Sequence, residues 1–138
     1  MNSESEPGSE SQPGSESQPG SGAGGNFDAV TDHALSAVNA RFYQALEAAD
    51  LEVMTALWDQ SSWASCAHPG RPPLIGWPAI EASWRAIFAA GGNPQVLVTE
   101  ERVVRRGSIG WVTVAENMIS NGHAGAATAI NVFEHDGG

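Results

Sequence analysis

Three polar side chains of the kinds used in acid–base catalysis lie in apolar parts of the chain. His68 ends an alternating segment, Glu116 lies in a run of otherwise uncharged residues, and Asn131 stands between two β-branched apolar residues. A carboxylate at a buried strand position is costly unless it is paired, and a buried amide needs hydrogen-bond partners. Imidazole and carboxylate groups can exchange protons with a substrate near neutral pH. These residues are therefore the candidates for an acid–base site.

Two of these residues have alternative interpretations. A histidine that ends a strand and is hydrogen-bonded to backbone is the commoner case at a position such as His68, and a one-residue bulge would turn Glu116 to solvent. If both side chains face one cavity, burial disfavours the ionised carboxylate and a nearby imidazole favours it, so the two groups are expected to titrate as a pair. Such a pair is what proton transfer at neutral pH requires.

The sequence gives little support to other kinds of site. Cys66 is the only cysteine, and His33, His123 and His135 are scattered without the spacing of metal ligands. The paired glycines fit turns rather than a phosphate-binding loop. We therefore predict neither a metal nor a cofactor.

Charge and composition narrow the possible partners. The 138 residues carry 16 acids against six arginines and no lysine, a formal net charge of −10. Such a field repels nucleic-acid backbones and anionic membranes, so neither is an expected partner. No basic segment followed by an apolar run opens the chain, and no apolar run approaches the ~20 residues of a membrane span. With a single cysteine, a reducing compartment is expected, and the prediction is a cytoplasmic protein.

The chain divides into a tail and one domain. Residues 1–25 contain the hexapeptides SESEPG, SESQPG and SESQPG and then a glycine-rich stretch, and the hexapeptide segment Ser3–Gly20 has no apolar side chain that could be buried. Nothing there offsets a backbone ordering cost of about 1–2 kcal/mol per residue, so a disordered tail is predicted. Residues 26–138 have the patterning of one folded domain, with a net charge of −6.

Three helices are predicted before any long strand. The first has an amphipathic stripe, the second follows Asp50 as its N-cap, and the third begins near Pro78 and ends at Gly91-Gly92. The stripe of the first helix comprises Val30, Ala34, Val38, Phe42, Ala45 and Ala49. Trp84 lies on the apolar stripe of the third helix, which we expect to face the sheet.

Four segments with a period of two are predicted as strands. The first is Ser62–His68, and the loop Arg71–Ile75 separates it from the third helix. The other three are Gln95–Arg105, Ile109–Ser120 and Ala124–His135, joined by turns at Arg106-Gly107 and Asn121-Gly122. The result is an antiparallel meander in which no further strand follows the last, so one sheet edge is left open.

This order of elements resembles a known superfamily. The segments RFYQALEAADLEVMTALW, IGWPAIEASWRAIF, GWVTVAENM and AINVFEH are similar to those of the nuclear transport factor 2-like superfamily, and within it the SnoaL-like domain group. The resemblance covers Val30 to His135. It implies an α+β, cone-shaped fold in which three N-terminal helices pack on a curved antiparallel sheet. The group normally adds one more strand after the last hairpin, so the chain resembles a member truncated before that strand.

The resemblance also implies which residues face the pocket of the cone. His68-Pro69 stands where the steroid isomerase branch places its basic aspartate, and Asn131 stands where that branch places an oxyanion donor. Phe42 corresponds to the branch's oxyanion tyrosine but lacks the hydroxyl, which counts against isomerase-type enolate chemistry. The implied catalytic residues are His68, Glu116 and Asn131, and the implied ligand-binding residues are Trp84, Val114, Met118, Phe133 and Phe42. Trp111, Thr113 and Asn117 fall on the opposite face of the sheet.

Three functional hypotheses follow. The leading one is a small-molecule-binding cone, acting as an acid–base isomerase, dehydratase or cyclase on an apolar substrate. The second is a non-catalytic association module that forms a homodimer through the outer sheet face, including Trp111. The third is a truncated chain that folds poorly without a further strand. The superfamily includes enzymes and non-catalytic domains, so the fold alone assigns no chemistry.

Overall fold

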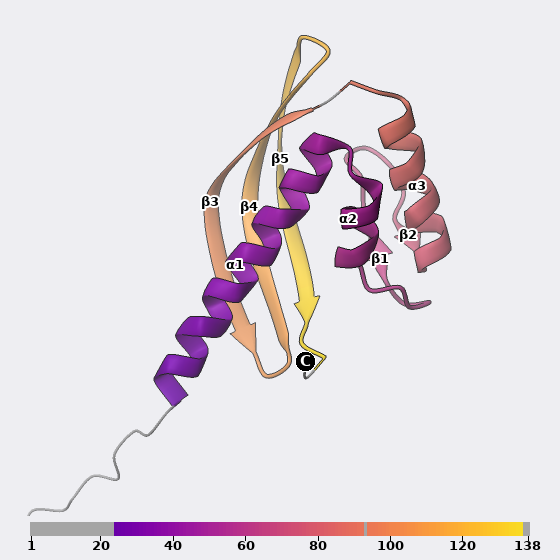
Figure 1. Cartoon of the computed structure of the whole chain (residues 1–138). Helices are drawn as coiled ribbons and strands as arrows, with labels where there is room; N and C mark the ends of the chain where they lie inside the picture. Colours follow the sequence, from indigo (N-terminus) through magenta and orange to yellow (C-terminus); the bar gives the residue numbers. More distant parts are fainter. Residues whose placement is uncertain (1–23, 93, 137–138) are drawn as a thin grey trace, which may run out of the picture.

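The computed structural model describes residues 24–92 and 94–136, with side chains described from residue 32 onward. Apart from its last two residues, the segment predicted as a tail lies outside this range. The helices are α1 (Gly24–Ala48), α2 (Leu51–Leu57) and α3 (Trp77–Ala89). The strands are β1 (Ser65–Cys66), β2 (Leu74–Ile75), β3 (Gln95–Arg106), β4 (Ile109–Ser120) and β5 (His123–Glu134) (Figure 1). The three predicted long strands are thus present, each within one residue of its expected bounds.

The three long strands form an antiparallel sheet in the order β3-β4-β5. Asn121 and Gly122, which join β4 to β5, both have positive φ angles of 51° and 77°. Two successive positive φ angles are those of a type I′ turn, which matches the twist of a hairpin, so the predicted turn is confirmed. On its other side β5 has no neighbouring strand among the described residues. The β5 edge of the sheet is therefore unpaired in the described part of the chain, as the sequence predicts, and β3 is the other edge strand.

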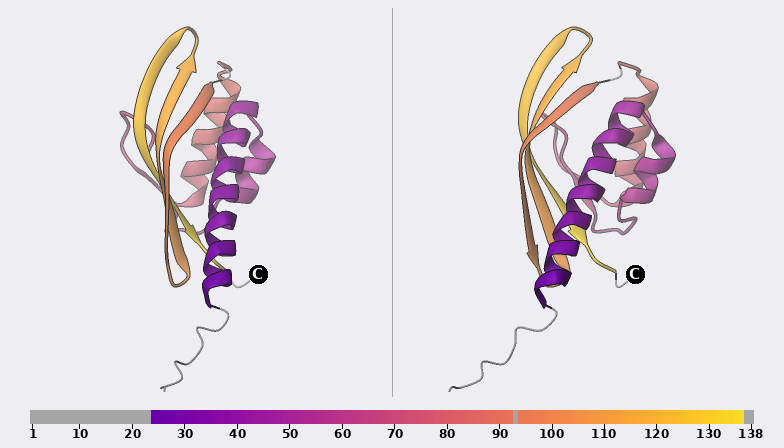
Figure 2. Two further views of the ribbon diagram at one scale, coloured as in Figure 1. Left: turned by 90° about the vertical axis from the view of Figure 1, so that its left-hand side faces the viewer. Right: turned by 60° about the vertical axis from the view of Figure 1, so that its left-hand side comes forward.

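The sheet is strongly curved, and all three helices lie on its concave side (Figure 2). This arrangement is the predicted α+β cone. The convex face has no helix over it, and several of its apolar side chains are exposed: Leu97, Ile119, Ile130 and Val132. No helix in the described residues is long and apolar enough to span a bilayer.

Helix α1 is rotated relative to the stripe predicted for it. Asn39 and Tyr43 are buried at 2% and 5% exposure, whereas Ala34 is exposed and Val38 is only partly buried. The row that faces the sheet is therefore Leu35, Asn39, Tyr43 and Leu46. The predicted stripe is correct at Ala45, which is in the core, and at Phe42, which packs against it. It is wrong at its N-terminal half because it counts only apolar residues, and the helix buries one amide and one hydroxyl in the row that faces the sheet.

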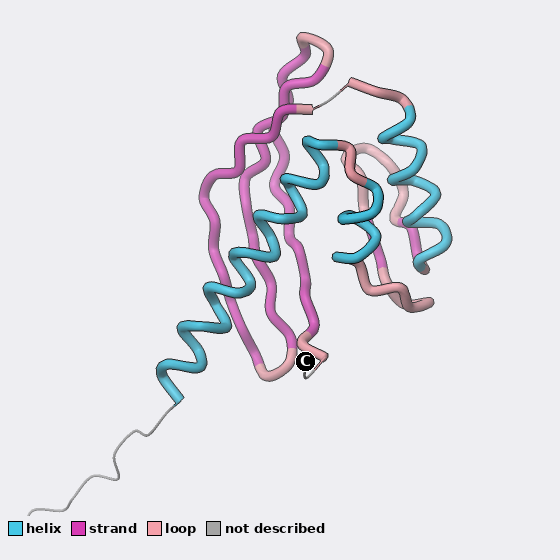
Figure 3. The backbone as a smooth tube through the Cα atoms, in the orientation of Figure 1, coloured by secondary structure: helices cyan, strands magenta, loops and turns pink. Residues whose placement is uncertain are grey.

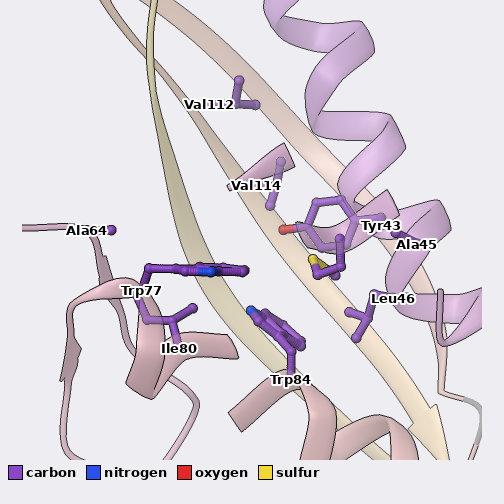
Figure 4. Packing of buried hydrophobic residues seen from close by; sticks show 10 residues of the cluster. Tyr43, Ala45, Leu46, Ala64, Trp77, Ile80, Trp84, Val112 and Val114 are labelled. Carbon is purple, nitrogen blue, oxygen red and sulfur yellow. The ribbon is translucent and has the colours of Figure 1, made fainter. Parts of the chain in front are cut away.

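The shorter helices begin and end where their local chemistry predicts. The Asp50 side chain accepts a hydrogen bond of 3.0 Å from the Val53 N–H, which caps α2. Pro78 lies in the first turn of α3, and Gly91 follows its end with a φ of 70°. All three helices and the sheet enclose a core of ten buried residues (Figure 4). They are Tyr43, Ala45, Leu46, Met54, Ala64, Trp77, Ile80, Trp84, Val112 and Val114.

The region around His68 is less regular than predicted. Only Ser65–Cys66 of the segment Ser62–His68 forms a strand, and it pairs with β2, which lies in the segment predicted as a loop (Figure 3). Alternation failed as a signal because a strand extends only as far as its partner, and this partner is two residues long. The short hairpin packs against α3.

Candidate functional site

A cavity of about 670 Å³ lies between the helices, the β1–β2 region and the open edge of the sheet. Aromatic and aliphatic side chains form most of its wall, which includes Phe42, Leu46, Trp58, Trp84, Ile87, Phe88 and Met118. The ionisable residues of the wall are Cys66, His68, Arg71 and Glu116. A second hollow of about 760 Å³ beside β3 is more open and carries only Glu47 as an ionisable residue. The first cavity therefore has the composition of a ligand site, an apolar wall with a few polar groups.

His68 is held in the wall by α3. Its Nε2 atom lies 3.0 Å from Ser83 Oγ, and the Ser83 hydroxyl donates to the Ile80 carbonyl at 2.7 Å. Because that hydroxyl hydrogen is directed to Ile80, the Ser83 oxygen accepts from Nε2, and the neutral ring carries its proton there. The ring also meets the edge of Trp84, with centroids 4.9 Å apart. The lone pair of His68 therefore lies on Nδ1.

Burial, and secondarily the positive charge of Arg71, lower the pKa of His68 below its ordinary value of 6.5. At pH 7 the ring is accordingly neutral and able to accept a proton. Cys66 Sγ lies 3.7 Å from the same Nε2 atom, and burial raises the pKa of this thiol to about 11. The thiol is therefore protonated at neutral pH and is a poor nucleophile.

Glu116 is held by a separate group of side chains. Its Oε1 atom accepts a hydrogen bond of 2.6 Å from the hydroxyl of Tyr43, which reaches from α1 toward the sheet (Figure 4). Burial, together with this hydrogen bond and the negative charge of Glu116, raises the pKa of Tyr43 well above its ordinary value of 10. The tyrosine therefore keeps its proton and is the hydrogen-bond donor in this pair over the whole physiological pH range.

Asn131 and Asn39 complete this second network. The amide nitrogen of Asn131 donates to Tyr43 Oη at 3.1 Å and to Asn39 Oδ1 at 2.7 Å. Both hydrogens of the Asn131 amide are thereby used, and the Tyr43 oxygen is left with its own hydrogen to give to Glu116. The network therefore has one direction, from Asn131 through Tyr43 to Glu116.

The two networks share the cavity without being joined. No hydrogen bond links His68 to Glu116 in the described part of the chain, because Ser83 holds the first and Tyr43 the second. The indole N–H groups of Trp58 and Trp84, which also line the cavity, are buried and have no partner among the described residues. A buried donor without a partner costs about 1–3 kcal/mol.

Residues 35–138 match the model of the SnoaL-like domain. The chain belongs to the SnoaL-like family. A structure from Streptomyces avermitilis, provisionally assigned as a dehydratase of the NTF2-like family, is 27% identical over 78% of this chain and 86% of that one, with a TM-score of 0.70.

Two further relatives of this SnoaL-like chain have different names. A structure from Thiobacillus denitrificans, provisionally assigned as a calcium/calmodulin-dependent protein kinase type II association domain, is 33% identical over 74% of this chain and 83% of that one, with a TM-score of 0.63. The F-box protein SKIP8 of Arabidopsis thaliana is 27% identical over 110 residues, 78% of this chain and 46% of that protein. The chain thus spans about half the length of this curated relative.

In this SnoaL-like domain the cavity wall contains six of the eight residues predicted for the site. They are His68, Glu116, Asn131, Trp84, Met118 and Phe42. Val114 is instead a core residue with 1% exposure, and Phe133 packs against the core. Neither is among the residues that line the cavity.

The sequence left open whether a bulge in β4 turns Glu116 to solvent. The pairing of β4 with β5 is continuous from Ile109 to Ser120, so the alternation of β4 is intact at Glu116. The irregularity lies in β3 instead, between Thr99 and Arg102, where Glu100 has a φ of 55°. A bulge in β4 that would turn Glu116 to solvent is therefore excluded.

Sequence reasoning missed Tyr43 and Asn39. The resemblance matches Phe42 to the helix-borne tyrosine of the steroid isomerase branch, but it is the next residue, Tyr43, whose hydroxyl contacts Glu116. One signal was available, because Asn39 and Tyr43 are four residues apart and therefore share a helix face. Their polarity argued against burial until partners on β4 and β5 were known.

Proposed function

We propose that this SnoaL-like domain binds an apolar small molecule in the 670 Å³ cavity and performs acid–base chemistry on it, of the isomerase, dehydratase or cyclase type. The observation that carries the proposal is that a neutral histidine and a hydrogen-bonded glutamate line one aromatic cavity. The dehydratase name of the similar Streptomyces protein is in line with it.

His68 takes the role of general base. Its Nε2–H is held by Ser83, which fixes the ring and leaves Nδ1 to accept a proton from an acidic C–H or O–H group of the substrate. Glu116 is the second acid–base group, acting through Oε2, because Oε1 is occupied by Tyr43. Asn131 orients Tyr43, and through it Glu116, since both of its amide hydrogens are used inside the network.

The test is turnover of apolar carbonyl and polyketide compounds by the wild type, His68→Ala and Glu116→Gln. Loss of a general acid or base lowers kcat by about 10²–10⁴-fold, and we expect each variant to lose activity within this range. His123→Ala and Glu52→Gln are matched controls, because both residues are exposed and lie outside the cavity. Turnover that survives unchanged in both cavity variants rejects the catalytic role.

The second candidate function is association of two copies through the convex sheet face. It is supported by the exposed side chains of Leu97, Ile119, Ile130 and Val132, which are 54–65% exposed, and by the association-domain name of the similar Thiobacillus protein. Sedimentation equilibrium tests it. A dimer that dissociates in Val132→Lys but persists when exposed residues of the helices are changed to Lys supports this interface. A protein that is monomeric at about 100 micromolar, a concentration at which weak dimers form, rejects it.

A further inference from the structure

Arg71 differs from the other charged residues around the cavity. Glu116 is engaged by Tyr43, but the Arg71 guanidinium has no ion pair or hydrogen bond within residues 24–92 and 94–136. By contrast Arg85, on the outside of α3, is paired with Glu81 at 2.8 Å. Arg71 is also the only arginine among the residues that line the cavity. The cavity therefore has one positive charge that no protein group neutralises by contact.

A tight turn fixes the place of Arg71 beside His68. The Arg71 N–H donates to the His68 carbonyl at 3.1 Å, Pro69 follows His68, and Gly70 has a φ of 74°. Proline followed by a residue of positive φ is the pattern of a type II turn. The effect of Arg71 on the His68 pKa agrees with this geometry, since it requires the guanidinium field to reach the imidazole. The turn thus fixes the backbone of Arg71 at the cavity, whose lining includes this residue.

Much of the rest of the cavity wall is aromatic and can pack against an aromatic part of a ligand. Trp84 makes edge or tilted ring contacts with Phe42, Trp58 and Phe88, with centroids 5.7–6.4 Å apart. Flat apolar molecules pack on such walls by burial of apolar area, worth about 25 cal/mol per Å². A ligand that fills this region leaves its polar end to the groups at the margin.

We propose that the cavity binds an organic monocarboxylate, with its aromatic or other apolar body against Trp84 and Phe42 and its carboxylate on the guanidinium of Arg71. This inference rests on the binding function proposed above and adds the charge of the ligand. Guanidinium and carboxylate groups form paired, charge-assisted hydrogen bonds. The negative charge of Glu116 favours the orientation in which the ligand carboxylate lies at Arg71.

The net charge of the chain does not cancel this preference. The domain's other acids act on the ligand from a distance, and at 0.15 M ionic strength charges farther than about 8 Å are largely screened. A guanidinium in contact is not screened to the same degree. One unpaired cation neutralises one anionic charge, so a monocarboxylate is favoured over a phosphate dianion, whose second charge would face Glu116.

The experiment is calorimetric titration of benzoate, 2-naphthoate and anthracene-9-carboxylate, each beside its uncharged carboxamide. We expect the wild type to bind the carboxylates at least about tenfold more tightly than the carboxamides, which is about 1.4 kcal/mol. Arg71→Gln should remove this preference and leave carboxamide binding unchanged. Arg85→Gln is the matched control, because it removes an arginine of α3 that lies outside the cavity, and it should retain the preference.

Two other outcomes separate the inference from the function on which it rests. Equal binding of carboxylates and carboxamides, unchanged in Arg71→Gln, overturns the carboxylate assignment and leaves small-molecule binding intact. Binding of no compound in either form overturns both. Arg71 is exposed, so its substitution is expected to leave the melting temperature unchanged, and a melting curve checks that the variant is folded.

Discussion

The hydrogen bond between Tyr43 and Glu116 can be measured as a coupling energy. Tyr43 is 5% exposed, and its hydroxyl lies 2.6 Å from the carboxylate. Hydrogen bonds to charged groups contribute about 1.5–3 kcal/mol net. We therefore expect Tyr43→Phe to lower the free energy of unfolding by about 2 kcal/mol, because it leaves the carboxylate partly buried without its donor. In a Glu116→Met background the same substitution should cost far less, since no carboxylate is left unpaired.

The assay is urea unfolding at pH 7 of the wild type, both single variants and the double variant, followed by tryptophan fluorescence. A coupling energy of about 1.5–3 kcal/mol is expected for this cycle. The control cycle combines Tyr43→Phe with Asn117→Ala. Asn117 lies one residue after Glu116 but bonds to Leu97 and Thr99 on the other face, so its coupling should stay below about 0.5 kcal/mol. Equal coupling in the two cycles refutes the assigned contact.

Four other measurements test parts of the same structure. Tyr43 is the only tyrosine, so the absorbance of tyrosinate at 295 nm reports its ionisation alone. Its raised pKa predicts that the folded protein does not ionise it at the ordinary value of 10. The contribution of Tyr43 to stability should be fully present below pH 10 and be lost as the pH rises above it. The lowered pKa of His68 means that the unfolded chain binds its proton first, so stability should fall as pH drops below 6.5 toward the folded-state pKa, and the His68→Asn variant should lack this part of the loss. At pH 8 iodoacetamide should label the single thiol of Cys66 more slowly in the folded than in the urea-unfolded protein; equal rates contradict its burial. A Cβ at Gly110 would overlap Leu35 Cδ1, so Gly110→Ala should lower the free energy of unfolding by about 1–3 kcal/mol. In a Leu35→Ala background the Gly110→Ala substitution should lower the urea midpoint by less.

Much of the fold could be predicted because its signals are local. The alternation of β3, β4 and β5, the Asn121-Gly122 turn and the Asp50 cap each depend on residues that are neighbours in the sequence. The extent of β1 could not be predicted, because it depends on pairing with Leu74 and Ile75. Pairing of that kind is tertiary information.

The sequence indicates polar candidate residues on the long strands but not on helix α1 for a related reason. Glu116 and Asn131 stand out because they interrupt apolar strands, whereas Asn39 and Tyr43 look ordinary on a helix with polar residues on several sides. Two adjacent helical residues point about 100° apart, so a prediction that places Phe42 instead of Tyr43 toward the site turns the helix by this angle away from its polar row. Only the partners on β4 and β5 show that this row is buried.

The directions of the two networks limit what kind of ligand the cavity can accept. Because Nε2 of His68 donates to Ser83 and the hydroxyl of Tyr43 donates to Glu116, the atoms of these wall residues that no hydrogen bond within the described residues uses are acceptors: His68 Nδ1, Glu116 Oε2 and the Asn131 carbonyl oxygen. A charged donor group lies elsewhere in the wall, on Arg71. A ligand that satisfies both sets presents an acidic hydrogen to the first and oxygen acceptors to the second. That requirement is the chemical reason to expect proton abstraction from an oxygen-bearing apolar molecule, and it depends on Asn39, which takes the hydrogen that would otherwise leave the Asn131 amide free to donate.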